Sequence, residues 1–149
     1  MAVLAVHARR DPGDDPPLSA TDQQRRTWDE MTRRDGLVAY VALIDAEPVG
    51  TATVVLMPNL TYQCAPTAFI EAVVVDHRYR RRGIATAMLT EVLNDARAAG
   101  CNKIQLLSHK RHADDGAHDL YTGLGFEPEA EGFRRYLIEP PAPPSSDQS

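Results

Sequence analysis

Short runs of apolar and β-branched residues recur along the chain, separated by polar segments that contain proline, glycine and asparagine. The first run, Ala2–His7, predicts a short strand, and the Pro- and Gly-containing stretch that follows it predicts a loop. Val38–Ile44 and Val49–Leu56 predict two further strands. The residues between them, Asp45–Pro48, are typical of a turn, so the pair is expected to form a hairpin.

Three more strands are expected further along the chain. Ala68–Val75 is apolar except for one acid, Glu71, and is preceded by the loop sequence MPNLTYQCAP. Lys103–Ser108 and Phe133–Ile138 have the composition of two later strands.

Helical spacing of apolar residues predicts a first helix that begins at Thr21. Thr21-x-x-Gln24 resembles a capping box, in which each residue satisfies a free backbone amide of the other. Trp28 and Met31 supply a sparse apolar face, and Gly36 is expected to stop the helix.

Two further helices follow the central strand. The first is closed by Gly100, and the residues that share its apolar face are Ala85, Leu89, Val92, Ala96 and Ala99. The second is short, with Asp114 as its expected N-cap and Gly125 at its end. Its common face consists of Ala117, Leu120, Tyr121 and Leu124. The resulting order, β-α-β-β-β-α-β-α-β, predicts a mixed sheet covered by helices.

Composition and charge narrow the class of protein. The chain has 149 residues, of which 43% are hydrophobic, which suits a single domain with its own core. This domain is expected over residues 1–139, and the Pro/Ser-rich residues 140–149 are expected to be a disordered tail. The net charge of -5 argues against nucleic acid as a partner. No apolar run reaches the roughly 18 residues of a membrane span, and the apolar start is too short for a secretory signal, so a cytoplasmic protein is expected.

Cysteine and histidine offer no metal site in this sequence. Cys64 and Cys101 alone build neither a disulfide framework nor a metal-binding spacing, and both are expected to be packing residues. His109, His112 and His118 lack the i, i+4 pairing of a zinc-binding helix and are expected to be solvated loop residues. No metal is therefore predicted.

The transition from the central strand into the long helix predicts an anion site. The first turn of a helix has backbone N–H groups without partners, and the helix dipole places partial positive charge there. A pyrophosphate fits such a place, provided that small residues such as Gly83 and Ala85 let it approach. Thr86 adds a hydroxyl donor, and the basic residues around the turn are Arg78, Arg80, Arg81 and Arg82. The alternative is a solvated basic loop in front of an ordinary core helix.

The same residues resemble a known family. Arg80-x-x-Gly83-x-Ala85 is similar to the Arg/Gln-x-x-Gly-x-Gly/Ala signature of the GNAT acetyltransferases, with alanine in place of the second glycine. The later segments GCNKIQLLS and AHDLYTGLGF resemble the next strand and the next helix of that family. The three motifs occur in the family's order between Phe69 and Phe126.

This resemblance implies a fold and a cofactor. The expected fold is an α+β GNAT fold, in which a mixed, mostly antiparallel sheet of six to seven strands splays at its middle and is flanked by about four helices. The expected co-substrate is acetyl-CoA. Backbone N–H groups at Val73 or Val75 are implied to bind the thioester carbonyl. The residues expected to bind the cofactor are Val73, Val75, Arg80, Arg81, Arg82, Gly83, Ile84, Ala85 and Thr86.

Acetyl transfer to an amine also requires proton transfer, and two residues are candidates. Tyr121 aligns with the family's tyrosine near the thioester sulfur, where a phenol can protonate the departing thiolate. Its alternative role is that of a core aromatic on an apolar stripe. Glu71 interrupts the apolar strand and is expected to face a cavity, where burial would make it a better base near neutral pH. A structural ion pair with an arginine is the alternative for Glu71, and water is an alternative base.

The acceptor is expected to be a small amine. The cofactor half of the chain resembles enzymes that act on glucosamine 6-phosphate or aminoalkylphosphonates, and Glu71 and Tyr62 are the expected contacts of the substrate. Tyr62 has a packing role as its alternative. A protein acetyltransferase and a catalytically silent acetyl-CoA-binding module are the other hypotheses. By analogy with the family, a homodimer formed with the help of the last strand is also expected. No membrane partner is expected.

Overall fold

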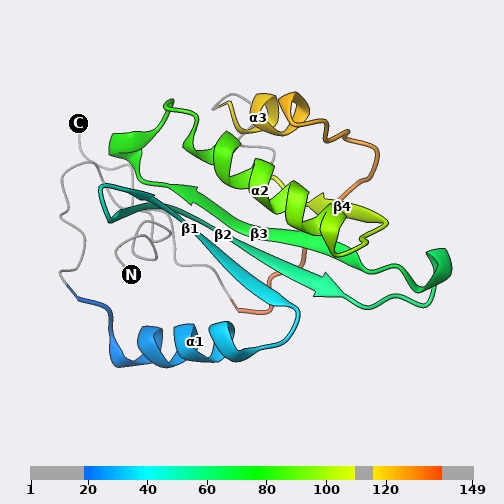
Figure 1. Cartoon of the computed structure of the whole chain (residues 1–149), viewed down its shortest axis with the longest axis horizontal. Coiled ribbons are helices and arrows are strands. Elements are labelled where there is room, and N and C mark those ends of the chain that lie inside the picture. Colours follow the sequence, from blue (N-terminus) through cyan, green and yellow to red (C-terminus); the bar gives the residue numbers. More distant parts are fainter. Residues whose placement is uncertain (1–18, 110–115, 139–149) are drawn as a thin grey trace.

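The computed structural model describes residues 19–109 and 116–138, which form one four-stranded sheet with helices on both sides (Figure 1). The strands are β1 (Leu37–Ile44), β2 (Glu47–Met57), β3 (Thr67–Val75) and β4 (Lys103–Leu106). The helices are α1 (Asp22–Arg33), α2 (Ile84–Ala98) and α3 (Ala117–Gly123), with the short 3-10 turns η2 (Tyr62–Cys64) and η3 (His77–Tyr79). β1, β2 and β3 are antiparallel neighbours, whereas β4 runs parallel to β3, so the predicted mixed sheet is confirmed.

The predicted start of α1 is confirmed in detail. The amide of Gln24 donates to Thr21 Oγ1 over 3.2 Å, and the amide of Thr21 donates to Gln24 Oε1 over 2.9 Å, which closes a capping box. The helix ends at Arg33, earlier than the predicted stop at Gly36. Gly36 has a φ of 76° and serves instead as the turn into β1.

The hairpin between β1 and β2 is tighter than its sequence suggested. Ile44 pairs with Glu47, so only Asp45 and Ala46 form the loop. Both have positive φ angles, of 49° and 65°, which is the geometry of a type I′ turn that matches the twist of the flanking strands. Glu47 is therefore the first residue of β2 and not part of the loop.

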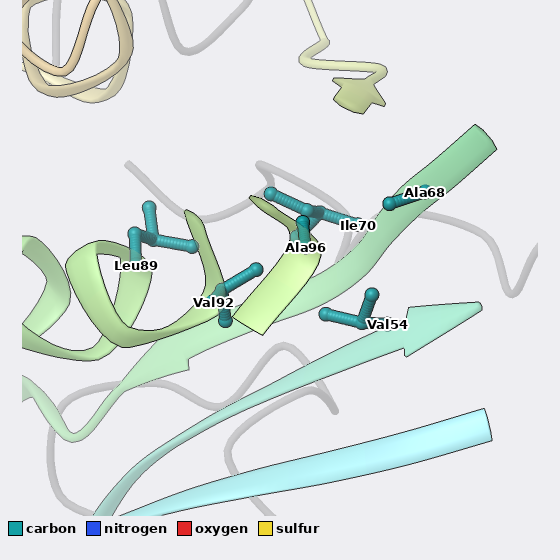
Figure 2. Close-up of a cluster of buried hydrophobic side chains, with 6 residues drawn as sticks. All are labelled: Val54, Ala68, Ile70, Leu89, Val92 and Ala96. Carbon is teal, nitrogen blue, oxygen red and sulfur yellow. The ribbon is translucent and has the colours of Figure 1, made fainter. Parts of the chain in front are cut away.

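The core lies between α2 and the adjacent face of the sheet (Figure 2). Its buried side chains are Val54, Ala68, Ile70, Leu89, Val92 and Ala96. Three of them come from the predicted apolar face of α2, because residues three and four apart lie on one side of a helix. Of the other two predicted positions, Ala85 is partly buried and Ala99 is an exposed C-cap.

Two later boundaries differ from the sequence prediction. The predicted strand Lys103–Ser108 ends as β4 at Leu106. The N-cap of α3 is Gly116, with a φ of 86°, and not Asp114, which lies outside the described residues.

The predicted strand at Phe133–Ile138 is wrong. These residues form no strand, and the side chains of Phe133, Leu137 and Ile138 are 88%, 91% and 85% exposed. An isolated apolar run does not make a strand without a neighbour to pair with, and no strand of the described residues pairs with it. The homodimer that was expected to use this strand stays a prediction. The expected strand Ala2–His7 and the expected tail, residues 140–149, lie outside the described residues.

A hydrogen bond between β1 and α2 fastens the helix to the sheet. The hydroxyl of Tyr40 donates to Asp95 Oδ2 over 2.8 Å. Burial and this bond raise the pKa of Tyr40 to about 12. Because this pKa lies above the ordinary 10.0, the hydrogen bond stabilises the folded state fully below about pH 10. This contribution to the free energy of unfolding is lost as the pH rises to about 12.

We expect Tyr40→Phe to be about 1 kcal/mol less stable than the wild type near neutral pH, because it lacks this bond. The difference should shrink as the pH rises from about 10 to about 12, where the wild-type hydroxyl ionises. Urea unfolding of both proteins across this range measures the difference in free energy. A difference that stays constant with pH contradicts the assignment.

Candidate functional site

The central strand carries a β-bulge at the point where the site begins. Glu71 pairs with Thr53 and Val74 pairs with Thr51, so Ala72 and Val73 together face the single residue Ala52. Ala72 has a φ of 54°, a left-handed conformation that is unusual for alanine. Such a bulge bends its strand and breaks the regular ladder.

Beyond the bulge, one edge of β3 is no longer paired. The parallel ladder with β4 ends at Ile70, opposite Leu106. On the other edge, the amide of Asp76 donates to Val49 O over 2.8 Å, which makes these two a hydrogen-bonded pair. In an antiparallel ladder the preceding residue, Val75, then directs its N–H and C=O away from β2. These groups therefore lie on the edge where pairing with β4 has ended, while the Val73 side chain packs on the core.

The first turn of α2 presents unpaired backbone amides. Gly83, the N-cap, has a φ of 74° and provides no side-chain cap, and the first turn contains no acidic residue. Within the described residues, the amides of Ile84, Ala85 and Thr86 have no hydrogen-bond acceptor. Arg81 also has a positive φ, of 62°. Left-handed residues alternating with right-handed ones form a concave nest of N–H groups that suits an anion.

The space outside this turn is open. A Cβ atom placed on Gly83 would meet no atom within 4 Å. The glycine is therefore required by its backbone angle and not by crowding within the protein. Bare backbone is therefore accessible at this point, and the pyrophosphate site that the sequence suggests here stays a prediction.

The four arginines of the loop have separate contacts. Arg78 donates to Asp76 Oδ2 over 2.7 Å and to Glu47 Oε1 over 3.0 Å, so its charge is offset and does not add to the predicted positive cluster. The hydrogen bond from Arg78 holds the pKa of Asp76 below its usual range. Arg80 Nε donates to Val75 O over 3.2 Å, which places this side chain at the open end of β3.

The two remaining arginines line the entrance to α2. The guanidinium of Arg81 lies against Gly116, where a Cβ atom would come within 3.5 Å of Nη1 and Nη2. This contact connects the start of α2 with the start of α3, and both helices begin at the same end of the molecule (Figure 1). The guanidinium of Arg82 lies over the Tyr79 ring, 5.3 Å from its centroid.

Tyr121 is held by packing on α3. Its ring meets the Phe126 ring edge-on, with centroids 6.0 Å apart, and it packs against the core cluster with Leu120 and Leu124. The packing role that was the alternative for Tyr121 is therefore real. Because the ring is only partly buried, packing does not exclude a role for its hydroxyl, which stays a prediction.

Glu71 is exposed, so the expected burial of this carboxylate is wrong. It pairs across the sheet with Thr53, which in turn pairs with Ala39. Since Tyr40 faces α2, this row lies on the opposite face of the sheet. The bulge that follows Glu71 opens the strand without covering the side chain. Among the described residues, Glu71 has no ion-pair partner, so the alternative of a structural pair with an arginine is not found.

Tyr62 lies away from the other candidates. It belongs to η2, at the end of the sheet opposite the start of α2 (Figure 1). Its ring is 64% exposed and contacts Lys103, whose Nζ lies 5.9 Å from the ring centroid. Its predicted contact with a substrate stays a prediction.

The cysteines and histidines of the described residues form no arranged site. Cys64 is exposed, and burial raises the pKa of the Cys101 thiol, which disfavours the thiolate. His112 lies outside the described residues. Within residues 19–109 and 116–138, no three His, Cys, Asp or Glu side chains gather closely enough to hold a metal ion. None of the helices in these ranges has the length and hydropathy of a bilayer-crossing segment.

Sequence reasoning missed three residues of this region. Glu47, Asp76 and Tyr79 hold the loop before α2 through hydrogen bonds, two of which span 31 and 32 residues. The only local signal was an acid directly after the strand end, since Asp76 accepts from the amide of Arg78 and caps η3. The contacts of Glu47 had no local signal.

Comparisons with known proteins find similar chains for most of this sequence. The model of the acetyltransferase (GNAT) family matches residues 5–126. Glucosamine 6-phosphate N-acetyltransferase of Trypanosoma brucei brucei is 30% identical over 121 residues, which are 80% of this chain and 78% of that protein. A solved structure from Agrobacterium tumefaciens str. C58, named as an acetyltransferase, is 31% identical with a TM-score of 0.78, and the match covers 90% of this chain and 88% of that one.

A second solved structure contains a bisubstrate analogue. AAC(6')-Iy, solved in complex with the bisubstrate analogue CoA-S-monomethyl-acetylneamine, is 22% identical with a TM-score of 0.65, and the match covers 83% of each chain. At this identity the likeness concerns the fold alone. Together the comparisons confirm the predicted fold class, of which the described residues form four strands and three α-helices.

Proposed function

The chain belongs to the acetyltransferase (GNAT) family and is an N-acetyltransferase, and from this premise we propose that it acetylates the primary amine of a small molecule with acetyl-CoA. The observation that carries the proposal is the unpaired first turn of α2 beside the unpaired edge of β3. The first turn of α2 provides N–H groups for an anion, and the edge of β3 provides an N–H group for a carbonyl oxygen. A diphosphate-bearing thioester needs both.

The residues at these two places fit acetyl-CoA. The amides of Gly83, Ile84, Ala85 and Thr86 would hold the pyrophosphate, because they point out of a helix start that no acid occupies. Arg81 and Arg82 flank this turn. Along the opened edge, the N–H of Val75 would bind the thioester carbonyl, and Val73 is the second candidate. When bound, acetyl-CoA supplies the activated acetyl group.

The transfer then requires a neutral amine and a protonated leaving group. In the proposed ternary complex, the amine approaches from the face of the sheet that carries Glu71, whose exposed carboxylate takes a proton from the ammonium group directly or through water. The N–H of Val75 stabilises negative charge on the carbonyl oxygen during attack. Tyr121 donates its hydroxyl proton to the departing sulfur.

A phosphorylated amino sugar is the acceptor that we propose to test first. The relative from Trypanosoma brucei brucei is named for glucosamine 6-phosphate, and its match extends over most of both chains. Glu71 adds a carboxylate to the exposed sheet face, which suits an ammonium group.

We expect the wild-type protein to release free thiol from acetyl-CoA when glucosamine 6-phosphate or a related small amine is present, and not with glucose 6-phosphate, which has no amine to attack. Thiol titration over an amine panel measures this, with mass spectrometry of the acetylated product. Release that does not depend on any amine, or acetylation of peptides alone, contradicts the proposal.

A further inference from the structure

The carboxylate of Glu47 uses both oxygens to hold the loop between β3 and α2. Oε1 accepts from Arg78 Nη2 over 3.0 Å, and Oε2 accepts from the Tyr79 hydroxyl over 2.8 Å. Glu47 is the first residue of β2, directly after the tight turn. Because β2 is a central strand of the sheet, this carboxylate ties the loop to a rigid element.

The same loop is anchored from inside by Asp76. This residue is only 8% exposed, and its amide donates to Val49 O on β2 over 2.8 Å. Its carboxylate accepts from the amide of Arg78 over 2.9 Å and from the guanidinium over 2.7 Å. Arg78 therefore bridges two carboxylates, one buried and one at the surface.

The Tyr79 ring connects these hydrogen bonds to the start of α2 through its contact with Arg82. The guanidinium carbons of Arg78 and Arg82 lie 5.4 Å and 5.3 Å from the ring centroid, a distance at which cation–π attraction operates. Arg82 directly precedes Gly83, the N-cap of α2. A continuous set of contacts thus runs from Glu47 through Tyr79 and Arg82 to the turn that presents the amides.

This turn needs external support. Arg81 is a non-glycine residue with a φ of 62°, and such a conformation costs about 1–2 kcal/mol and persists only where its surroundings over-determine it. Among the described residues, the amides of the first turn of α2 have no acceptor that would hold them in place. The order of this nest of N–H groups therefore depends on the contacts that Glu47, Tyr79 and Arg82 make with one another.

We propose that Glu47 is a positioning residue for the pyrophosphate site. Through Tyr79, Glu47 sets the shape of the start of α2 without touching the cofactor. The inference rests on the proposed function, because it assigns the support of the same anion site.

Charge and positioning predict opposite results for the loss of Glu47. If this carboxylate acted only through its charge, its removal would raise the positive potential near the loop and tighten the binding of an anion. If it positions the loop, its removal frees Tyr79 and Arg82, and binding weakens. The sign of the change in affinity therefore separates the two.

We expect Glu47→Ala to raise the Kd and the KM for acetyl-CoA about five- to tenfold, while kcat and the KM for the amine stay within about twofold. The melting temperature should fall by no more than about 3 °C, since surface ion pairs contribute little to stability. Calorimetric titration with acetyl-CoA measures the Kd. Unchanged or tighter binding, with or without a loss of stability, overturns the proposal.

Asp45→Asn is the matched control. It removes the same charge two residues away, makes no ion pair in the described part of the chain, and asparagine tolerates the φ of 49°. Its Kd should stay within about twofold of the wild type. A rise equal to that of Glu47→Ala would show that any change in the β1–β2 turn weakens binding, whether or not the contacts of Glu47 are lost, and would overturn the proposal.

Tyr79→Phe tests the path of the effect. It removes the hydroxyl bonded to Glu47 and keeps the ring beneath Arg82. It should weaken binding by itself, and Glu47→Ala should add less in this background than in the wild type. Fully additive effects contradict a path through Tyr79. A wild-type protein that does not bind acetyl-CoA would overturn the proposed function itself, whereas normal wild-type binding with an unaffected Glu47→Ala variant removes only the positioning role.

Discussion

Gly83→Glu should abolish measurable binding of acetyl-CoA, with a Kd at least about 100-fold higher than that of the wild type. The expected reason is local: a carboxylate at this position lies among the unpaired amides of Ile84, Ala85 and Thr86 and competes with a phosphate for them. It also adds like charge to the proposed site of a dianion. Calorimetry and the amine-dependent release of thiol measure the loss.

Gly100→Glu separates this effect from backbone strain. Gly100 has a φ of 72°, against 74° for Gly83, and an added Cβ meets no atom within 4 Å at either position. Both substitutions therefore carry the same cost of a left-handed side-chain residue, but Gly100 follows the opposite end of α2. We expect its Kd for acetyl-CoA to stay within about threefold of the wild type. Equal losses in both variants would mean that strain in α2 and not the anion site is responsible.

Tyr121→Phe should lower kcat about 100-fold and leave both KM values within about threefold. The hydroxyl is proposed to protonate the sulfur as the bond to the acetyl group breaks, so its loss acts mainly on the transition state. The substitution keeps the ring and its edge-on contact with Phe126, and α3 should remain in place. Steady-state kinetics with both substrates varied gives the two sets of constants.

Tyr40→Phe is the control for the loss of a tyrosine hydroxyl. Tyr40 is also partly buried and packs against the core, but its hydroxyl bonds Asp95 between β1 and α2. We expect this variant to be less stable and to keep its turnover within about twofold. If Tyr121→Phe also keeps wild-type turnover, Tyr121 has a packing role only.

The elements of the site were predictable from sequence where their causes are local. Thr21 and Gln24 cap α1 because they are three residues apart, and the buried face of α2 follows from residues spaced by three and four. The strand-to-helix turn at Gly83 has the same origin, because the apolar spacing places the helix start and the first turn of any helix has backbone amides without intrahelical partners. This segment is also the first of the three motifs on which the family resemblance rests.

Errors arose where a residue's surroundings come from elsewhere in the chain. Glu71 interrupts an apolar strand and so suggested burial, but a strand has two faces and its own residues do not reveal which one is covered. Phe133–Ile138 has the composition of a strand and lacks a partner among the described strands. The composition of a segment specifies neither the strand that it pairs with nor which of its faces other elements cover.

The sequence by itself determined the capping box of α1, the hairpin and the strand-to-helix turn at Gly83, because each depends on residues within about a dozen positions of one another. The family resemblance rests on three such local motifs between Phe69 and Phe126. Only the tertiary structure decided that Arg78 is neutralised by Glu47 and Asp76, that Arg81 reaches Gly116, and that the β3–β4 ladder ends at Ile70. Glu47 contacts residues 31 and 32 positions away, and such contacts exist only after the sheet has brought the two segments together. Charged side chains pair with the groups that lie near them in the folded structure. Their order along the chain does not show which groups these are.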